Sequence, residues 1–229
     1  MNKSNKIFLL LIIILLIIVV CSILFIIGFS TYSKALKEKP LMERVTNITT
    51  SDNFVKYNNL SRYYVNAVIA TEDHRYYDHG PVDFIGLFRA IYTNISNGEL
   101  QEGGSTITQQ VAKNVILSQE ASISRKLAEL FGAYELEKNY TKNEILEIYV
   151  NTAYFGDGYY GIYQASHGYY NKEPADLTLS EASMLAGIPN APSVYAPTVN
   201  PDLAKKRQKH VLKAMVEYGY ISKQEADSI

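Results

Sequence analysis

Residues 103–114, GGSTITQQVAKN, place two glycines directly before a helix start. Glycine lets the backbone approach a ligand closely, and Ser105 or Thr106 can cap the helix that follows. The free N–H groups and the positive dipole end of such a helix suit an anion such as a phosphate. Gln109 and Lys113 are four residues apart and therefore share one face. The stretch predicts either an ordinary capped polar helix or a site for a sugar–phosphate ligand, but not a Walker loop, whose spacing it lacks.

Helix signals continue through most of the chain. Apolar residues recur at helical spacing over about 82–96 and 123–139. Three further helices open with a capping box, in which a Ser or Thr is followed three residues later by Glu. The sequence therefore predicts a mainly α fold without a βαβ series. Its helices are expected over about 60–70, 82–96, 105–117, 123–139 and 200–218, with others opening at Thr141, Thr178 and Ser222.

An apolar run of 23 residues, Ile7–Phe29, contains no charged residue. As a helix rising about 1.5 Å per residue it would be about 34 Å long, enough to cross a bilayer. A cleavable signal peptide is the alternative, but its apolar region is usually about 7–15 residues long and ends at a small-residue cleavage site. The run therefore predicts one transmembrane helix at 7–29 behind a cytoplasmic tail at 1–6. Lysines flank both ends of the run, so charge alone does not fix its orientation.

The 200 residues after the apolar run form the part that can fold outside the membrane. Residues 30–54 are predicted as a polar connector in which the β-prone RVTNITT, 44–50, can form short strands, and 55–229 as the domain. This part carries 20 basic and 23 acidic residues, which argues against a nucleic-acid surface. Cys21 is the only cysteine and lies in the apolar run, so the domain holds neither a disulfide nor a cysteine metal site.

Residues 71–80, TEDHRYYDHG, gather ionisable side chains at the end of an apolar helix. A carboxylate beside aromatic residues can have a raised pKa and act as a base, and Glu72 is the candidate. A solvated charge at a helix end is the alternative.

Residues 125–129, RKLAE, also allow a structural and a functional interpretation. At 100° per residue, Arg125 and Glu129 lie on one side of the helix beside the small residues Gly132 and Ala133. They form either an ordinary surface ion pair or a charged face with room for a ligand. The apolar residues of the same helix cluster on its other side, namely Leu127, Leu130, Phe131 and Tyr134.

Five segments occur in a fixed order: ATEDHRYYDHGPVDF, GGSTITQQVAKN, RKLAE, ILEIYVN and YFGDGYYGIYQAS. Together they resemble the five motifs of the peptidoglycan glycosyltransferases, glycosyltransferase family 51, which include the monofunctional transglycosylases and the N-terminal module of class A penicillin-binding proteins. The resemblance covers about residues 55–200. Tyr76 stands where the family usually has phenylalanine, and Val150 where it often has leucine. The resemblance implies a mainly α, lysozyme-like domain of two lobes behind the transmembrane helix.

The resemblance also implies a reaction. The family joins disaccharides carried on a polyprenyl pyrophosphate, lipid II, into glycan strands with inversion and release of the pyrophosphate. Glu72 matches the general base and Glu129 the second glutamate of the family. Asp73 and His79 match positions that we interpret as scaffold. The expected substrate-binding residues are Lys113, Arg125 and Lys126, toward the pyrophosphate, and Ser105 and Gln109, toward sugar or phosphate.

The implied setting is a bacterial cell membrane, with the catalytic domain on the outer side. The expected partners are lipid II, the growing glycan strand and the bilayer, with other cell-wall synthesis proteins as further candidates and no nucleic acid. No cofactor is required by the sequence, and no metal site is predicted, although a divalent cation such as Mg²⁺ or Mn²⁺ can assist departure of the pyrophosphate. The segment Val115–Ile123 is expected to be mobile at the substrate cleft.

No S-x-x-K or K-T-G motif occurs in the chain, so we expect a monofunctional enzyme that does not bind penicillin. Two alternatives remain open: a muramidase that cleaves glycan, and an inactive scaffold in a cell-wall complex.

Overall fold

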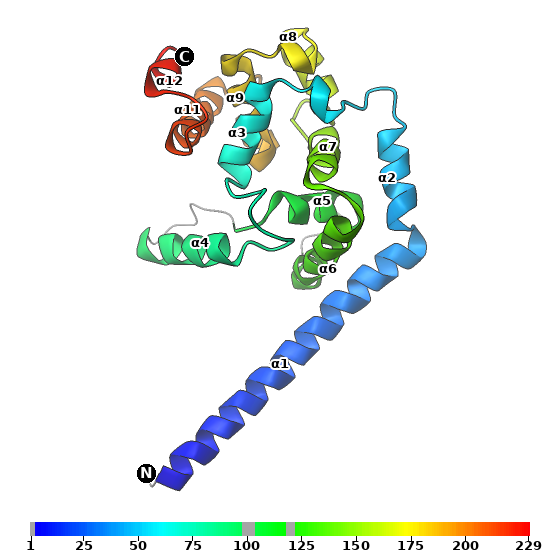
Figure 1. The fold of residues 1–229 in the computed structure, drawn as a ribbon, viewed down its shortest axis with the longest axis vertical. Coiled ribbons are helices and arrows are strands. Elements are labelled where there is room, and N and C mark those ends of the chain that lie inside the picture. Colours follow the sequence, from blue (N-terminus) through cyan, green and yellow to red (C-terminus); the bar gives the residue numbers. More distant parts are fainter. Residues whose placement is uncertain (1–2, 98–103, 118–121) are drawn as a thin grey trace.

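The computed structural model describes residues 3–97, 104–117 and 122–229, and within these ranges the chain is mainly helical (Figure 1). The mainly α prediction is confirmed, and the one β feature in the described part is an isolated bridge between Tyr154 and Tyr160. The α-helices are α1 (Lys3–Glu38), α2 (Leu41–Thr49), α3 (Arg62–Glu72), α4 (Phe84–Asn97), α5 (Ile107–Val115), α6 (Ile123–Asn139), α7 (Lys142–Thr152), α8 (Ile162–Tyr170), α9 (Leu179–Gly187), α10 (Pro192–Tyr195), α11 (Pro201–Glu217) and α12 (Lys223–Asp227).

Helix α1 extends as a single rod from one side of the helical body (Figure 1). Among the described residues it is the one helix long and apolar enough to cross a bilayer, over Asn5–Glu38. It continues well past the predicted span of 7–29 and takes in the first part of the predicted connector. The C-terminal half of α1 packs along α6 and so joins the rod to the domain.

The prediction of short strands in residues 44–50 is wrong, because this segment belongs to helix α2. Leu41 and Val45 are buried, and Ile48 packs against the same core. These three residues follow one another at spacings of four and three, which is one face of a helix. Burial of that face against the domain outweighs the β-propensity of the threonines.

The helices of the body form two packed groups. Helix α3 packs against α9 and α11, while α5 packs between α6 and α7. The core between them contains large side chains with no exposed surface, among them Tyr64, Ile145, Leu146 and Phe155. Tyr76 and Val150, the two departures from the family pattern, are also buried, and the Tyr76 hydroxyl donates to the carbonyl of Lys142 at 2.7 Å.

Helix α4 forms close to the predicted range and lies to one side of the body (Figure 1). Leu87 and Ala90 on its inner side face Gly104. Much of the apolar face that identified the helix is instead exposed, since five large side chains are 64–77% exposed: Phe84, Ile85, Phe88, Tyr92 and Ile95. A patch of this size at helical spacing is typical of a surface that meets a partner or a membrane.

The helix starts agree with the sequence patterns. Thr141, Thr178 and Ser222 each accept a hydrogen bond from the backbone of the glutamate three residues later, and each glutamate returns the bond. Thr106, rather than Ser105, caps α5. Residues 118–121, the middle of the segment 115–123 predicted to be mobile, lie outside the described residues, as does most of the glycine loop before Gly104.

Helix α6 has the predicted bounds, but its small residues do not leave room for a ligand. Gly132 lies against α5, where an added Cβ would be 2.9 Å from Cβ of Ala112. Ala133 is fully buried. The expectation of open space beside these residues is therefore wrong, because α5 fills it.

Candidate active site

A cleft of about 590 Å³ runs between α3, α5 and α11. One wall is the C-terminal end of α3 with its following loop, and another is the polar face of α11. The charged and polar side chains that line the cleft are Thr71, Glu72, Asp73, His74, Arg89, Ser105, Gln110, Lys113, Asn190, Arg207, His210, Lys213, Glu217 and Tyr218. Such a basic and hydroxylic lining suits a phosphorylated, sugar-containing ligand better than an apolar one.

Glu72 is the last residue of α3. Its Oε2 atom accepts a hydrogen bond of 2.7 Å from Nε2 of Gln110, and its Oε1 atom lies 3.8 Å from Nη2 of Arg207. Oε1 accepts no hydrogen bond from the described residues. A carboxylate has about four acceptor positions, so the described residues leave part of the acceptor capacity of Glu72 unused.

Two tyrosines form the wall behind Glu72. Tyr64 and Tyr149 are buried, and burial together with the charge of Glu72 raises the pKa of both phenols far above the ordinary value. Both phenols therefore remain neutral at physiological pH.

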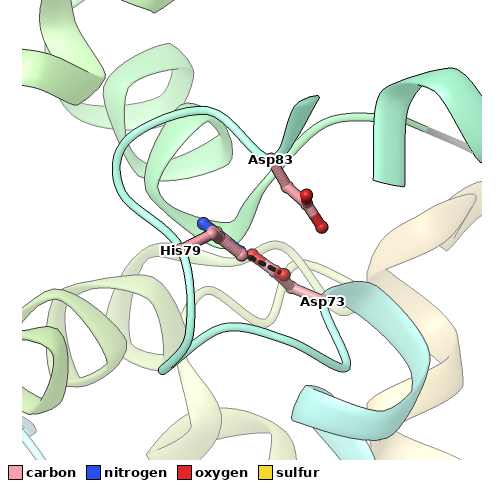
Figure 2. Close-up of side chains that lie close together, drawn as sticks. All are labelled: Asp73, His79 and Asp83. Atoms are coloured by element: carbon pink, nitrogen blue, oxygen red, sulfur yellow. Dashed lines mark hydrogen bonds and ion pairs between the residues drawn. The ribbon is translucent and has the colours of Figure 1, made fainter. Parts of the chain in front are cut away.

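The loop after Glu72 is held by a strut of hydrogen bonds, of which Figure 2 shows the one between His79 and Asp73. Nε2 of His79 lies 2.7 Å from Oδ1 of Asp73, and Nδ1 of the same ring lies 2.5 Å from the carbonyl oxygen of Gly80. Oδ2 of Asp73 accepts from the backbone N–H of Ile107, the first residue of α5, at 3.1 Å. The strut therefore ties the loop beside Glu72 to the start of α5, in agreement with the scaffold role expected for Asp73 and His79.

Both ring nitrogens of His79 face acceptors, so both bonds form only in the doubly protonated ring. Burial lowers the pKa of His79, but the hydrogen bonds to Asp73 and Gly80 outweigh it and leave the pKa raised. Electrostatic attraction to Asp73 acts in the same direction, and Lys142 opposes it.

Asp73, His79 and Asp83 offer ligand atoms within 4.8 Å of one another, close enough to hold a metal ion. Their atoms are engaged by protein donors, however. Asp83 pairs with the guanidinium of Arg75 and accepts from the N–H of Gly86 at 2.9 Å. These contacts account for the cluster as a structural hydrogen-bond network without a cation.

Helix α5 presents its polar residues on different sides. Gln109 is 4% exposed and does not line the cleft. Its Oε1 atom accepts from the N–H of Thr106 at 2.9 Å, completing the capping box. Gln110 and Lys113 line the cleft instead. Burial lowers the pKa of Lys113, and the charges of Arg125 and Lys126 lower it further, while Glu129 and Glu72 oppose that shift.

The RKLAE segment is not a surface ion pair, because Glu129 is only 2% exposed. Nζ of Lys126 lies 2.5 Å from Oε2 of Glu129 and donates to Oγ of Ser105 at 2.7 Å. Nε of Arg125 lies 3.8 Å from Oε1 of Glu129. Ser105, which lines the cleft, thus links this charged cluster to the cleft that contains Glu72.

The sequence did not indicate the wall formed by α11. Arg207, His210 and Lys213 recur every three residues, a spacing typical of a polar helix face, but nothing local shows what that face meets. At the other end of the cleft the His74 ring stacks on Tyr218, with centroids 4.2 Å apart, and contacts Arg89 of α4. Burial, followed by the charges of Arg89 and Arg75, lowers the pKa of His74.

A family model described as Transglycosylase matches residues 38–216, most of the chain. This chain belongs to the transglycosylase family. The matched range includes α2, α3, α5 and all of α11 except its last residue, and it begins before the domain start expected at residue 55.

Among curated relatives, penicillin-binding protein 1A of Neisseria flavescens is 49% identical over 174 residues, which are 76% of this chain and 22% of the relative. Penicillin-binding protein 1F of Bacillus subtilis is 47% identical over 172 residues, 75% of this chain and 24% of the relative. The chain thus spans less than a quarter of the length of these transglycosylase-family relatives.

The crystal structure of penicillin-binding protein 1A from Haemophilus influenzae is 30% identical and covers 53% of this chain and 15% of that one, with a TM-score of 0.37.

Proposed function

We propose that this chain polymerises lipid II into peptidoglycan glycan strands by inverting glycosyl transfer. The observation that carries the proposal is the position of Glu72. It lines a cleft with the basic residues Lys113 and Arg207 and lies next to the charged cluster of α6. A base beside several cations is the combination that attack by an alcohol with loss of a pyrophosphate requires.

In the proposed step, Glu72 removes the proton from the 4-hydroxyl of the acceptor sugar. The hydroxyl oxygen attacks the anomeric carbon of the donor, and the bond from that carbon to the pyrophosphate oxygen breaks. The proton ends on the Glu72 carboxylate, and the electron pair leaves with the polyprenyl pyrophosphate. An alcohol is too weak an acid to ionise beforehand at neutral pH, so a positioned base is needed.

The cations have the complementary role. Lys113 and Lys126 would stabilise the negative charge that grows on the leaving pyrophosphate, with Arg125 beside them. Glu129 holds Lys126 by its contact of 2.5 Å, and Lys126 in turn holds Ser105. A divalent cation would add to this charge stabilisation, bound mainly by the pyrophosphate itself.

The bilayer is the proposed surface on which the reaction occurs. Helix α1 would anchor the chain as a single pass with the domain outside, and the exposed apolar face of α4 would lie against the lipid. Confining the enzyme to the surface that holds its substrate raises the effective concentration of both. The growing glycan strand and other cell-wall synthesis proteins are further proposed partners.

The test is to incubate the purified full chain in detergent with fluorescent lipid II and, separately, with preformed glycan. Polymer from lipid II and no shortening of glycan is the expected result. Shortening of glycan without polymer would establish a muramidase, and neither activity despite bound lipid II would establish a scaffold. A fluorescent penicillin in a third sample should leave the chain unlabelled, as expected for a monofunctional enzyme.

A further inference from the structure

The C-terminal half of α1 carries a stripe of residues that contacts α6. Phe25, Phe29 and Tyr32 are spaced by four and three residues and therefore share a helix face. All three rings surround Phe131 of α6, with ring centroids 5.0, 5.6 and 6.0 Å away. The first two contacts are edge-to-face, an arrangement that aromatic pairs favour.

Gly28 lies at the centre of this stripe. A Cβ atom added to Gly28 would be 2.7 Å from Cβ of Leu127 and 3.1 Å from the ring of Phe131. Carbon atoms in proteins do not approach so closely without displacement of one of them. Even alanine at position 28 would therefore push α1 and α6 apart, so the observed spacing of these helices requires glycine.

The opposite side of α6 is equally close to α5. An added Cβ at Gly132 would lie 2.9 Å from Cβ of Ala112 and 3.1 Å from the side chain of Ile116. Helix α6 is thus held between α1 and α5, with a glycine at each contact. A well-packed layer of this kind transmits a shift from one side to the other, because it has no free volume to absorb it.

A single arginine, Arg44, joins the C-terminal ends of α1 and α5, the two helices on either side of α6. Nη2 of Arg44 donates to the carbonyl of Ala35 at 2.8 Å and Nε to that of Lys39 at 2.7 Å, both at the end of α1. Nη1 donates to the carbonyl of Val115, the last residue of α5, at 3.1 Å. One guanidinium therefore donates to backbone carbonyls at the C-terminal ends of two helices.

We propose that α1 is a positioning element of the active site and not only a membrane tether, with Gly28 and Arg44 as its positioning residues. The layer of α1, α6 and α5 sets the distance between Lys126 and Glu129 on α6 and Gln110 and Lys113 on α5. Its kinetic consequence rests on the proposed function. A tether affects how often the enzyme meets its substrate, whereas a positioning element affects how fast the bound substrate reacts.

The kinetic test compares Gly28→Ala and Gly28→Leu with Ile26→Ala in detergent. Ile26 lies about 160° away around the helix and is 64% exposed, so its substitution leaves the contact with α6 intact. We expect Gly28→Leu to lower kcat for lipid II on the order of tenfold with KM unchanged, Gly28→Ala to lower it less, and Ile26→Ala to retain the wild-type kcat. The double variant Gly28→Ala/Leu127→Gly, which removes the opposing Cβ, should recover part of the lost rate.

A second readout does not depend on catalysis. Hydrogen exchange followed by mass spectrometry should show faster exchange in α5 and α6 of Gly28→Leu and of Arg44→Met, with α9 and α11 unchanged. Wild-type kcat in both variants, together with unchanged exchange in α5 and α6, would overturn the inference. If the wild-type chain makes no polymer, the proposed function fails and hydrogen exchange alone decides the inference. If Gly28→Leu does not fold, Gly28→Ala and Arg44→Met decide it.

Discussion

The side-chain amide of Gln110 donates a hydrogen bond of 2.7 Å to Oε2 of Glu72. The neighbouring Gln109 faces the other way and completes the cap of α5. Two adjacent glutamines of one motif therefore have different roles: Gln110 contacts the proposed base, and Gln109 stabilises the start of α5. Each role can be tested by replacing one glutamine alone.

Replacing Gln110 by alanine should impair catalysis more than folding. The hydrogen bond fixes the position of Oε2 of Glu72, so its loss leaves the proposed base free to adopt other orientations. We expect kcat for lipid II to fall on the order of tenfold while the melting temperature stays near the wild-type value. The measurement is the rate of lipid II polymerisation together with thermal unfolding, and a wild-type kcat in the variant would contradict the assignment.

Replacing Gln109 by alanine should have the opposite effect. The cap of α5 loses the acceptor for the N–H of Thr106, which costs about 1 kcal/mol of folding free energy. Thermal unfolding should therefore shift to lower temperature while kcat stays near the wild-type value. A normal melting temperature with a large loss of activity would instead indicate that Gln109 contacts the substrate.

The strut between Asp73 and His79 makes stability depend on pH. The pKa of His79 is raised in the folded state, so its protonated ring stabilises the fold fully below the unfolded value of about 6.5. This contribution disappears as the pH rises through the raised, folded pKa. We expect the difference in unfolding free energy between wild type and His79→Gln to be larger at pH 5.5 than at pH 9. An equal difference at both pH values would show that the ring is neutral in the fold.

Lys113 should determine the alkaline limb of the profile of kcat/KM against pH. Burial lowers the pKa of its ammonium, so the charge is lost earlier on the alkaline side than in an exposed lysine. Lys113→Met should lower kcat/KM on the order of a hundredfold, and Lys113→Arg should retain activity with the alkaline limb moved to higher pH, because arginine keeps its charge. Lys209→Met makes the same change of charge at an exposed position of α11 outside the cleft, and its rate should equal that of wild type. Equal losses in both methionine variants would point to net charge as the cause.

Local patterns predicted the helices and most of their caps, since spacing and capping boxes act over a few residues. The same signal was present at Thr106 and Gln109, which form a threonine–glutamine capping box, and it would have assigned Gln109 to the cap. The strands expected in residues 44–50 failed because burial of Val45 is a tertiary effect.

The walls of the site depend on contacts that no local pattern contains. Arg207 reaches Glu72 only because α11 packs on α3, far away in the sequence. The burial of Glu129 likewise follows from the packing of α6 between α1 and α5. Residue types and motif order therefore indicated Glu72, Lys113 and Ser105, whereas the basic wall of α11 required the fold.

The central claim is that Glu72 removes the acceptor proton, and the most direct test is polymerisation of labelled lipid II by wild type and by Glu72→Gln. Glutamine is of nearly equal size and can still accept the bond from Gln110, so folding and lipid II binding should persist. The account predicts glycan from wild type and a loss of about a hundredfold or more in the variant. A Glu72→Gln enzyme that makes glycan at the wild-type rate would contradict it.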